Sequence, residues 1–133
     1  MARSPATPGD PAHKGCQRRE ACVKIEHFEI RDSVMRKEDP TWKFALGASP
    51  ITEGKLVRLA LGDGTEAFGY ASATAHMGAI SPALEGQLAY LKDSVVGKDC
   101  RDIEAILAGL ERAMRGAAQA KAGIDCALHD LLA

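Results

Sequence analysis

The pattern that most restricts the fold is a pair of apolar segments, residues 55–61 and 66–71, separated by four turn-forming residues. Apolar residues alternate along the first segment and therefore share one face of a strand. Asp63-Gly64 lies between the segments, and its glycine can supply the positive φ that a short hairpin turn requires. The pattern predicts a β-hairpin whose apolar face must be covered by another layer of structure.

A further strand is predicted upstream, over residues 22–31. The apolar residues up to Ile25 and those from Phe28 onward lie at opposite parity, so a regular strand cannot direct both sets to one face. A β-bulge near Glu26-His27 would reconcile the two halves. With the hairpin, this strand gives a three-stranded antiparallel sheet.

Three helices are predicted after the hairpin, since apolar residues recur there at helical spacing. Ser81 is interpreted as an N-cap before Pro82, with Gly97 ending this first helix. Asp99 is predicted to cap the second helix and Gly116 to end it. The three apolar stripes are Leu84, Leu88, Leu91 and Val95; Ile103, Ile106, Leu107, Leu110 and Met114; and Ala120, Ile124, Ala127, Leu128 and Leu131. The fold class is therefore α+β, a three-stranded antiparallel sheet followed by about three packed helices.

The two ends of the sequence differ. Residues 1–21 are rich in proline and glycine and nearly free of bulky side chains, which predicts a flexible N-terminal extension. A transit peptide or a wrongly assigned start codon are the alternatives for this segment. The last helix reaches Ala133 with no Gly, Asn or Pro to end it, so we expect it to lead into a further domain.

Composition excludes several classes of protein. The formal net charge is -1, so no basic excess indicates nucleic-acid binding. No apolar run approaches the ~18 residues of a membrane helix, and the N-terminus lacks a secretory apolar core. The 4 cysteines form no CxxC pair, which favours a reducing cytoplasm. His13, Cys16, Cys22 and His27 match no zinc spacing and are interpreted as unrelated side chains, so no metal ligand is assigned.

Spacing also argues against a catalytic pair in the last helix. Asp125 and Asp130 are five positions apart, about 140° around a helix axis, and so lie on different faces. Lys24, Lys55 and Lys121 are isolated in the sequence, with no neighbour that would depress a pKa. No catalytic residue is assigned.

Residues 33–54 form a long segment without periodicity, which is typical of a functional lid or of disorder. Trp42, Phe44 and Leu46 argue against disorder, because a solvated loop gains nothing from large apolar side chains. Two interpretations remain: these side chains fold back on their own domain, or they cover a ligand pocket on a neighbouring domain.

Several stretches resemble the N-terminal domain of the mandelate racemase/muconate lactonizing enzyme family, part of the enolase superfamily. They are the hairpin end Gly69-Tyr70-Ala71-Ser72-Ala73, the cap at Ser81, the link 96–99 with Asp102-Ile103-Glu104, and above all the ending 120–132, with its A-x-x-x-I-D-x-A-L-x-D-L pattern. The resemblance covers residues 22–133. It departs from the family at His129, where an aromatic residue usually stands.

The resemblance implies a capping domain over the mouth of a TIM-like barrel, with two loops that shape substrate choice. The matching segments are about residues 33–54 and 72–80, so Trp42, Phe44, His76 and Met77 are the substrate-loop candidates. In the family, a base removes a proton α to a carboxylate, and Mg²⁺ stabilises the enediolate. Metal ligands and bases lie on the barrel, which this sequence does not include.

The resemblance implies a racemase, epimerase, cycloisomerase or dehydratase in full-length relatives, acting on a small carboxylate. The ending favours muconate cycloisomerase and dipeptide epimerase relatives. We expect a truncated form that is inactive alone and whose missing partner is the barrel, in cis or in trans; self-association stays open. The alternatives are a stand-alone binding module with the cap fold, and one subunit of a split enzyme. A stand-alone module should bury the stripe of the last helix on its own sheet. A fragment should expose apolar surface there and around Trp42 and Phe44.

Overall fold

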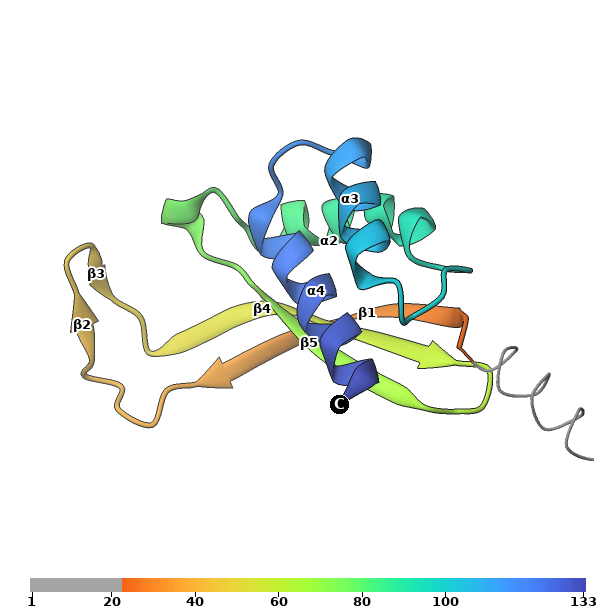
Figure 1. Cartoon of the computed structure of the whole chain (residues 1–133). Helices are drawn as coiled ribbons and strands as arrows, with labels where there is room; N and C mark the ends of the chain where they lie inside the picture. Colours follow the sequence, from red (N-terminus) through yellow and green to blue (C-terminus); the bar gives the residue numbers. More distant parts are fainter. Residues whose placement is uncertain (1–22) are drawn as a thin grey trace, which may run out of the picture.

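The computed structural model describes residues 23–133, and it confirms the predicted α+β fold. The main sheet has the antiparallel order β1-β4-β5, and all three α-helices lie on one of its faces (Figure 1). Its strands are β1 (Ile25–Arg36), β4 (Ile51–Leu61) and β5 (Glu66–Ser72), and a separate small hairpin comprises β2 (Lys43–Phe44) and β3 (Gly47–Ala48). The helices are α2 (Ser81–Leu91), α3 (Ile103–Ala113) and α4 (Ala118–Leu132), with the short 3₁₀ turns η1 (Ala75–Met77) and η2 (Lys92–Ser94). The predicted extension 1–21, which contains His13 and Cys16, lies outside the described residues, and so does Cys22.

The predicted bulge is present in β1. The register against β4 shifts between Ile25 and His27, so that Ile25 and Phe28 are both buried although their parities differ. The strand does not end at residue 31 as expected but continues to Arg36, since β4 begins early, at Ile51, and pairs with it. Strand β1 is therefore 12 residues long and reaches beyond the helical layer (Figure 1).

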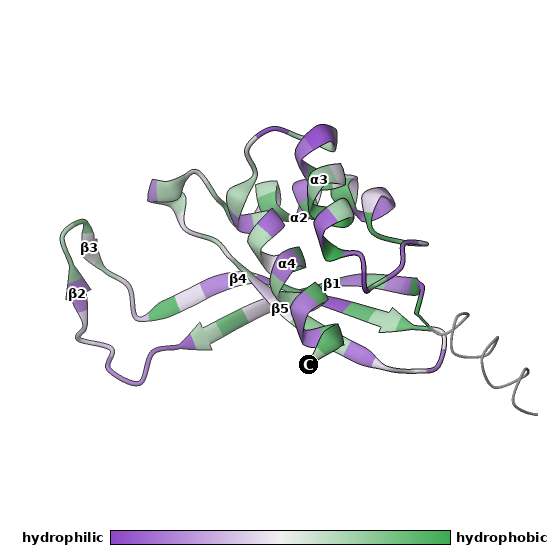
Figure 2. Cartoon of the chain, viewed as in Figure 1, coloured by the Kyte–Doolittle hydropathy of each residue, from purple (hydrophilic) through white to green (hydrophobic). Residues whose placement is uncertain are grey.

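The core lies between the sheet and the helices. Figure 2 shows hydrophobic and hydrophilic residues mixed along each helix, and the buried hydrophobic ones form one cluster with those of the sheet. The largest fully buried side chains come from both layers: Ile25, Val57, Leu59, Leu84, Leu88, Leu91, Val95, Leu110, Ile124 and Leu128. Each such side chain contributes about 1.5–3 kcal/mol relative to exposure. Seven of these ten side chains belong to the predicted helical stripes.

Helix α4 crosses β5 at two glycines. A Cβ at Gly69 would lie 1.9 Å from the carbonyl oxygen of Gly123, and a Cβ at Gly123 would lie 2.9 Å from the Cβ of Ala71. Further along α4, Oδ2 of Asp130 accepts a hydrogen bond of 2.9 Å from the backbone N–H of Phe68. Because β5 is an edge strand, this carboxylate satisfies a main-chain donor that has no neighbouring strand. Asp130 of the family-like ending therefore has a structural role.

The predicted helix boundaries differ from the structure by a few residues. Ser81 is the first residue of α2 and Ile80 its N-cap, and α2 ends at Leu91, before η2, rather than at Gly97. Asp102, not Asp99, is the N-cap of α3. Asp99 lies one turn earlier, where its carboxylate accepts bonds from the main chain and guanidinium of Arg101.

The Asp99 carboxyl should respond to acid in a predictable direction. Hydrogen bonds from Arg101 lower the pKa of Asp99 from 3.8 to about 2. A carboxylate with a lowered folded-state pKa contributes stability that is complete above pH 3.8 and is lost as the pH falls toward 2. We expect an NMR titration to place the Asp99 midpoint near pH 2 and the Arg101→Ala variant to raise it; a midpoint unchanged by that substitution would contradict the assignment.

Residues 33–54 are not the long loop expected from the sequence. The ends of β1 and β4 continue past β5 as a two-stranded arm, and the β2–β3 hairpin forms its tip (Figure 1). Pairing extends to Arg36 and Ile51, and the backbone N–H of Lys37 donates to the carbonyl of Pro50 at 3.0 Å. The segment is thus an extension of two strands that ends in a small hairpin. Because the extension is exposed on both faces, its residues do not alternate between apolar and polar.

Candidate functional site

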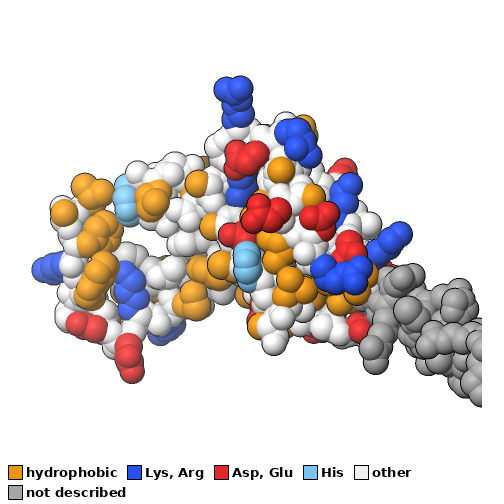
Figure 3. Space-filling view, in the orientation of Figure 1, with side chains coloured by type: hydrophobic (Ala, Val, Ile, Leu, Met, Phe, Trp, Pro, Cys, Tyr) orange, Lys and Arg blue, Asp and Glu red, His pale blue; other side chains and the backbone are white. Residues whose placement is uncertain are grey.

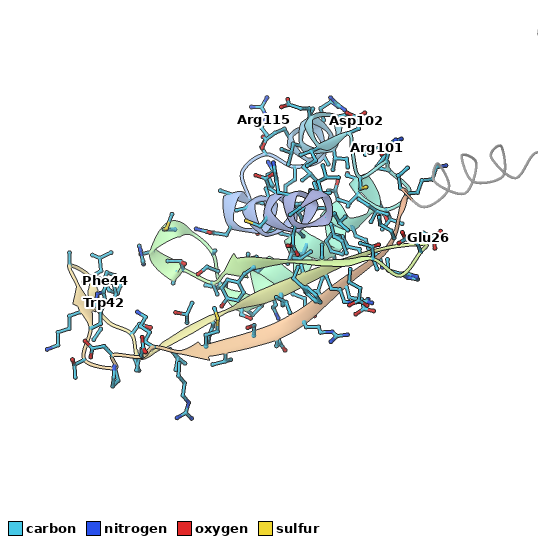
Figure 4. The ribbon with its side chains drawn as sticks, turned by 60° about the horizontal axis from the view of Figure 1, so that its bottom comes forward. Glu26, Trp42, Phe44, Arg101, Asp102 and Arg115 are labelled. Carbon is cyan, nitrogen blue, oxygen red and sulfur yellow. The ribbon has the colours of Figure 1, made fainter. Side chains whose placement is uncertain are left out.

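Three of the predicted loop residues meet at the tip of the arm. The rings of Trp42 and Phe44 stack with centroids 5.5 Å apart and planes inclined by 26°. The imidazole of His76, from η1, lies 5.5 Å from the Phe44 ring at 39°. Figure 4 shows Trp42 and Phe44 on the arm, far from the helical layer. The two segments expected to form substrate loops are therefore in contact through Phe44 and His76.

A lysine that the sequence did not single out completes this row of rings. Nζ of Lys37 lies 4.2 Å from the Trp42 ring centroid, a cation–π arrangement. Lys37 is the first residue after β1, and its main-chain bond to Pro50 holds it at the base of the hairpin. The row runs in the order Lys37, Trp42, Phe44, His76.

A pocket of about 630 Å³ opens beside these rings, within the size range of small-molecule sites. Its lining combines the aromatic row with residues from the start of β4 and from the segment after β5. Its lining residues are Lys37, Trp42, Phe44, Ser49, Ile51, Thr52, Glu53, Ser72, Ala73, Thr74, Ala75 and His76. Its lysine and its carboxylate are Lys37 and Glu53. The sequence did not identify Glu53 as a pocket residue, because Glu53 reaches the pocket only through the early start of β4 at Ile51.

Met77, the fourth candidate, does not line this pocket. Its side chain is largely exposed, and its sulfur lies 3.5 Å from Nε2 of Gln119 on α4. Met77 therefore connects η1 to the start of α4, while the neighbouring His76 faces the arm.

Exposed apolar side chains gather around the arm, whereas α4 exposes one large apolar side chain, Leu132, at its end. Figure 3 shows hydrophobic side chains gathered at the end of the arm, beside a hollow in the surface. The exposed large hydrophobic residues of the arm and η1 are Val34, Met35, Trp42, Leu46, Ile51 and Met77. In contrast, Ile124 and Leu128 of α4 are fully buried on their own sheet. Leu131 is only partly buried, so burial of the stripe is incomplete at the end of α4, and the exposed apolar surface at the arm is what a fragment would show.

The acidic residues of α4 do not form a pair. Asp130 binds the Phe68 amide, whereas Asp125 lies beside His129, whose Nδ1 is 3.0 Å from the Asp125 carbonyl oxygen. Within residues 23–133, no three His, Cys, Asp or Glu side chains are grouped so as to hold a metal ion. Nor does any helix of the described part have the length and apolar character needed to cross a membrane.

Two lysines that look isolated in the sequence are paired in the structure. Lys55 is 4% exposed, and its ammonium bonds to Asp32 and, at 3.0 Å, to Glu85. The hydrogen bonds to Asp32 and then Glu85 raise the pKa of Lys55. Nζ of Lys121 lies 2.9 Å from Oε1 of Glu111. The two lysines are therefore not isolated, because their partners lie on other strands and helices, although the partners of Lys55 raise its pKa and do not depress it.

Fold and pocket together define the class: an α+β domain whose helices cover one sheet face and whose strand arm carries a ligand-sized pocket. Residues 26–133 match the family described as mandelate racemase / muconate lactonizing enzyme, N-terminal domain. The chain belongs to this family, as its ending indicated.

Among known proteins, an L-Ala-D/L-Glu epimerase from Clostridium acetobutylicum is 40% identical over 78 residues, which are 57% of this chain and 22% of that protein. A substrate-liganded L-Ala-D/L-Glu epimerase from Bacillus subtilis has 28% identity and a TM-score of 0.72, covering 80% of this chain and 30% of that one. A dipeptide epimerase from Cytophaga hutchinsonii, complexed with Mg and the dipeptide D-Ala-L-Val, shares the fold at 23% identity and a TM-score of 0.74, covering 82% and 30%. The chain thus spans less than a third of each relative.

Proposed function

We propose that residues 22–133 are the capping domain of an enzyme that removes a proton α to the carboxylate of a dipeptide. The observation that carries this proposal is the pocket at the arm, where Trp42, Phe44 and His76 converge from the two expected substrate loops. The epimerase relatives support the dipeptide class. The exposed apolar surface around the pocket is the face that a barrel domain would cover.

In this proposal the cap binds and orients the substrate while the barrel carries the chemistry. The rings exclude water from the substrate's side chains, and the η1 segment closes the pocket from the other side. The residues described here do not fit a Mg²⁺ site, since no group of three possible ligands is present among them. We therefore assign no step of the reaction and no metal contact to this chain, and we place it in the cytoplasm with the barrel as its partner.

The proposal is tested by joining residues 1–133 to the barrel of the Bacillus subtilis epimerase and following α-proton exchange. L-Ala-L-Glu is incubated in D₂O with Mg²⁺, and loss of the α-proton signal is measured by NMR. We expect exchange with the chimera and none with the chain alone. Phe44→Ala should lower kcat/KM about tenfold, a loss of about 1.4 kcal/mol of transition-state stabilisation.

Tyr90→Ala is the matched control, because Tyr90 is an exposed aromatic residue on α2 that does not line the pocket. It should leave kcat/KM unchanged. Exchange by the chain alone would refute the expected inactivity. A folded chimera that Phe44→Ala and Tyr90→Ala affect equally would refute the role of the pocket.

The second candidate function is a stand-alone binding module with the cap fold. It is favoured by the burial of Ile124 and Leu128, because α4 needs no second domain to cover its stripe. Such a module would bind a dipeptide or another ligand without a barrel, and it would stay monomeric by analytical ultracentrifugation. Co-purification with a separate barrel chain would instead identify a split enzyme.

A further inference from the structure

The relatives leave open which side chain the pocket receives, since their named dipeptides carry both an acidic residue and a valine. The charges of this pocket bear on that choice. Its lining contains a lysine, a glutamate and a histidine among otherwise neutral side chains. A ligand that packs on Trp42 and Phe44 would lie next to the ammonium group of Lys37.

Lys37 differs from the other sheltered lysines of this domain. Lys55 and Lys121 each have a carboxylate within 3.0 Å. Lys37 is half-buried and contacts the Trp42 ring, yet within the described residues no carboxylate oxygen lies within 4.0 Å of its ammonium. Its positive charge is therefore uncompensated and lies at the pocket's aromatic wall.

Glu53 is the acidic residue of the pocket lining. It belongs to β4, where its carbonyl oxygen accepts a 2.8 Å hydrogen bond from Ala73, and its register partner in β1 is Val34. Its carboxylate acts on Tyr70, whose pKa is raised by burial and by this negative charge. Glu53 and Lys37 form no ion pair. The positive charge of Lys37 therefore lies against the Trp42 ring, and the negative charge of Glu53 belongs to β4.

We propose that Lys37 determines specificity by selecting a dipeptide with an acidic side chain. The ligand's methylene groups would pack on Trp42 and Phe44, and its terminal carboxylate would pair with Lys37. A cationic side chain along the same wall would meet the ammonium that already occupies the indole face. This inference rests on the proposed function, because it takes the pocket to be a dipeptide site.

The sequence contains a single tryptophan, so Trp42 fluorescence reports directly on this wall. The 133-residue chain is titrated with L-Ala-L-Glu, L-Ala-L-Gln and L-Ala-L-Lys. The first two differ only in the end group of the second side chain, and the third carries a longer, cationic side chain. We expect L-Ala-L-Glu to bind about threefold more tightly than L-Ala-L-Gln, a small ratio because ion pairs open to water are weak. L-Ala-L-Lys should bind most weakly.

Lys37→Met keeps an unbranched stem over the indole and removes the charge, so it should abolish the preference for the acidic dipeptide. Lys37→Arg should retain it, and Lys92→Met, at an exposed lysine outside the pocket, should change nothing. Equal affinity for the three dipeptides, a preference that survives Lys37→Met, or no saturable change with any dipeptide would each overturn the inference.

The two proposals fail separately. If the chimera exchanges the α-proton but shows no charge preference, the role of Lys37 is refuted and the capping function stands. If the isolated chain prefers the acidic dipeptide while the chimera is inactive, the charge selection stands without the capping function.

Discussion

Gly69→Ala should destabilise the domain by about 3 kcal/mol, at the upper end of the range for overpacked cores. The new methyl group would lie 1.9 Å from the carbonyl oxygen of Gly123 and 2.7 Å from the backbone nitrogen of Ala127. Both contacts are to main-chain atoms of α4, so no side-chain rotation relieves them and the whole helix must move away from β5. Urea denaturation monitored by circular dichroism measures the loss.

Gly86→Ala is the matched control. Gly86 lies in the middle of α2, and a Cβ there would have no atom within 4 Å. Because alanine favours a helix interior over glycine by about 1 kcal/mol, this variant should be slightly more stable than the parent. If Gly69→Ala had the same effect as Gly86→Ala, the close packing of α4 on β5 would be wrong.

Leu128→Ala should cost about 3 kcal/mol, within the range measured for buried leucines. Leu128 is fully buried in the cluster that joins α4 to the sheet, so truncation leaves a cavity in addition to the lost burial. The free energy of unfolding from denaturant titration measures this cost. The variant also tests whether α4 belongs to this domain's own core.

Leu132→Ala, one turn further along α4, is the corresponding control because Leu132 is 49% exposed. Its cost should be within about 0.5 kcal/mol, as for surface positions in general. Equal effects at both positions would mean that α4 does not pack on the sheet as the structure has it.

Much of this fold could be predicted because its signals are local. The parity change between Ile25 and Phe28 predicted a bulge that the register confirms. Asp63-Gly64 predicted the turn, in which Gly64 has a φ of 89°. The apolar stripes predicted the helices, since burial on one side of a helix must recur at its own period.

The arm could not be predicted in the same way. Strands that are exposed on both faces carry no alternation of apolar and polar residues, so residues 33–54 read as an irregular loop. The ion pairs of Lys55 were missed for a related reason. Its partners Asp32 and Glu85 are 23 and 30 positions away, and nothing in the sequence brings them to the same place.

The sequence by itself determined the family, the fold class and four candidate residues of the substrate loops. The tertiary structure decided that Trp42, Phe44 and His76 meet, that Met77 turns toward α4, and that Lys37 and Glu53 join the pocket. The physical reason is that helices and turns depend on neighbours within a few residues. A pocket depends on which distant strands pair and how far they extend, and here the pairing of β1 with β4 carries the arm beyond the core.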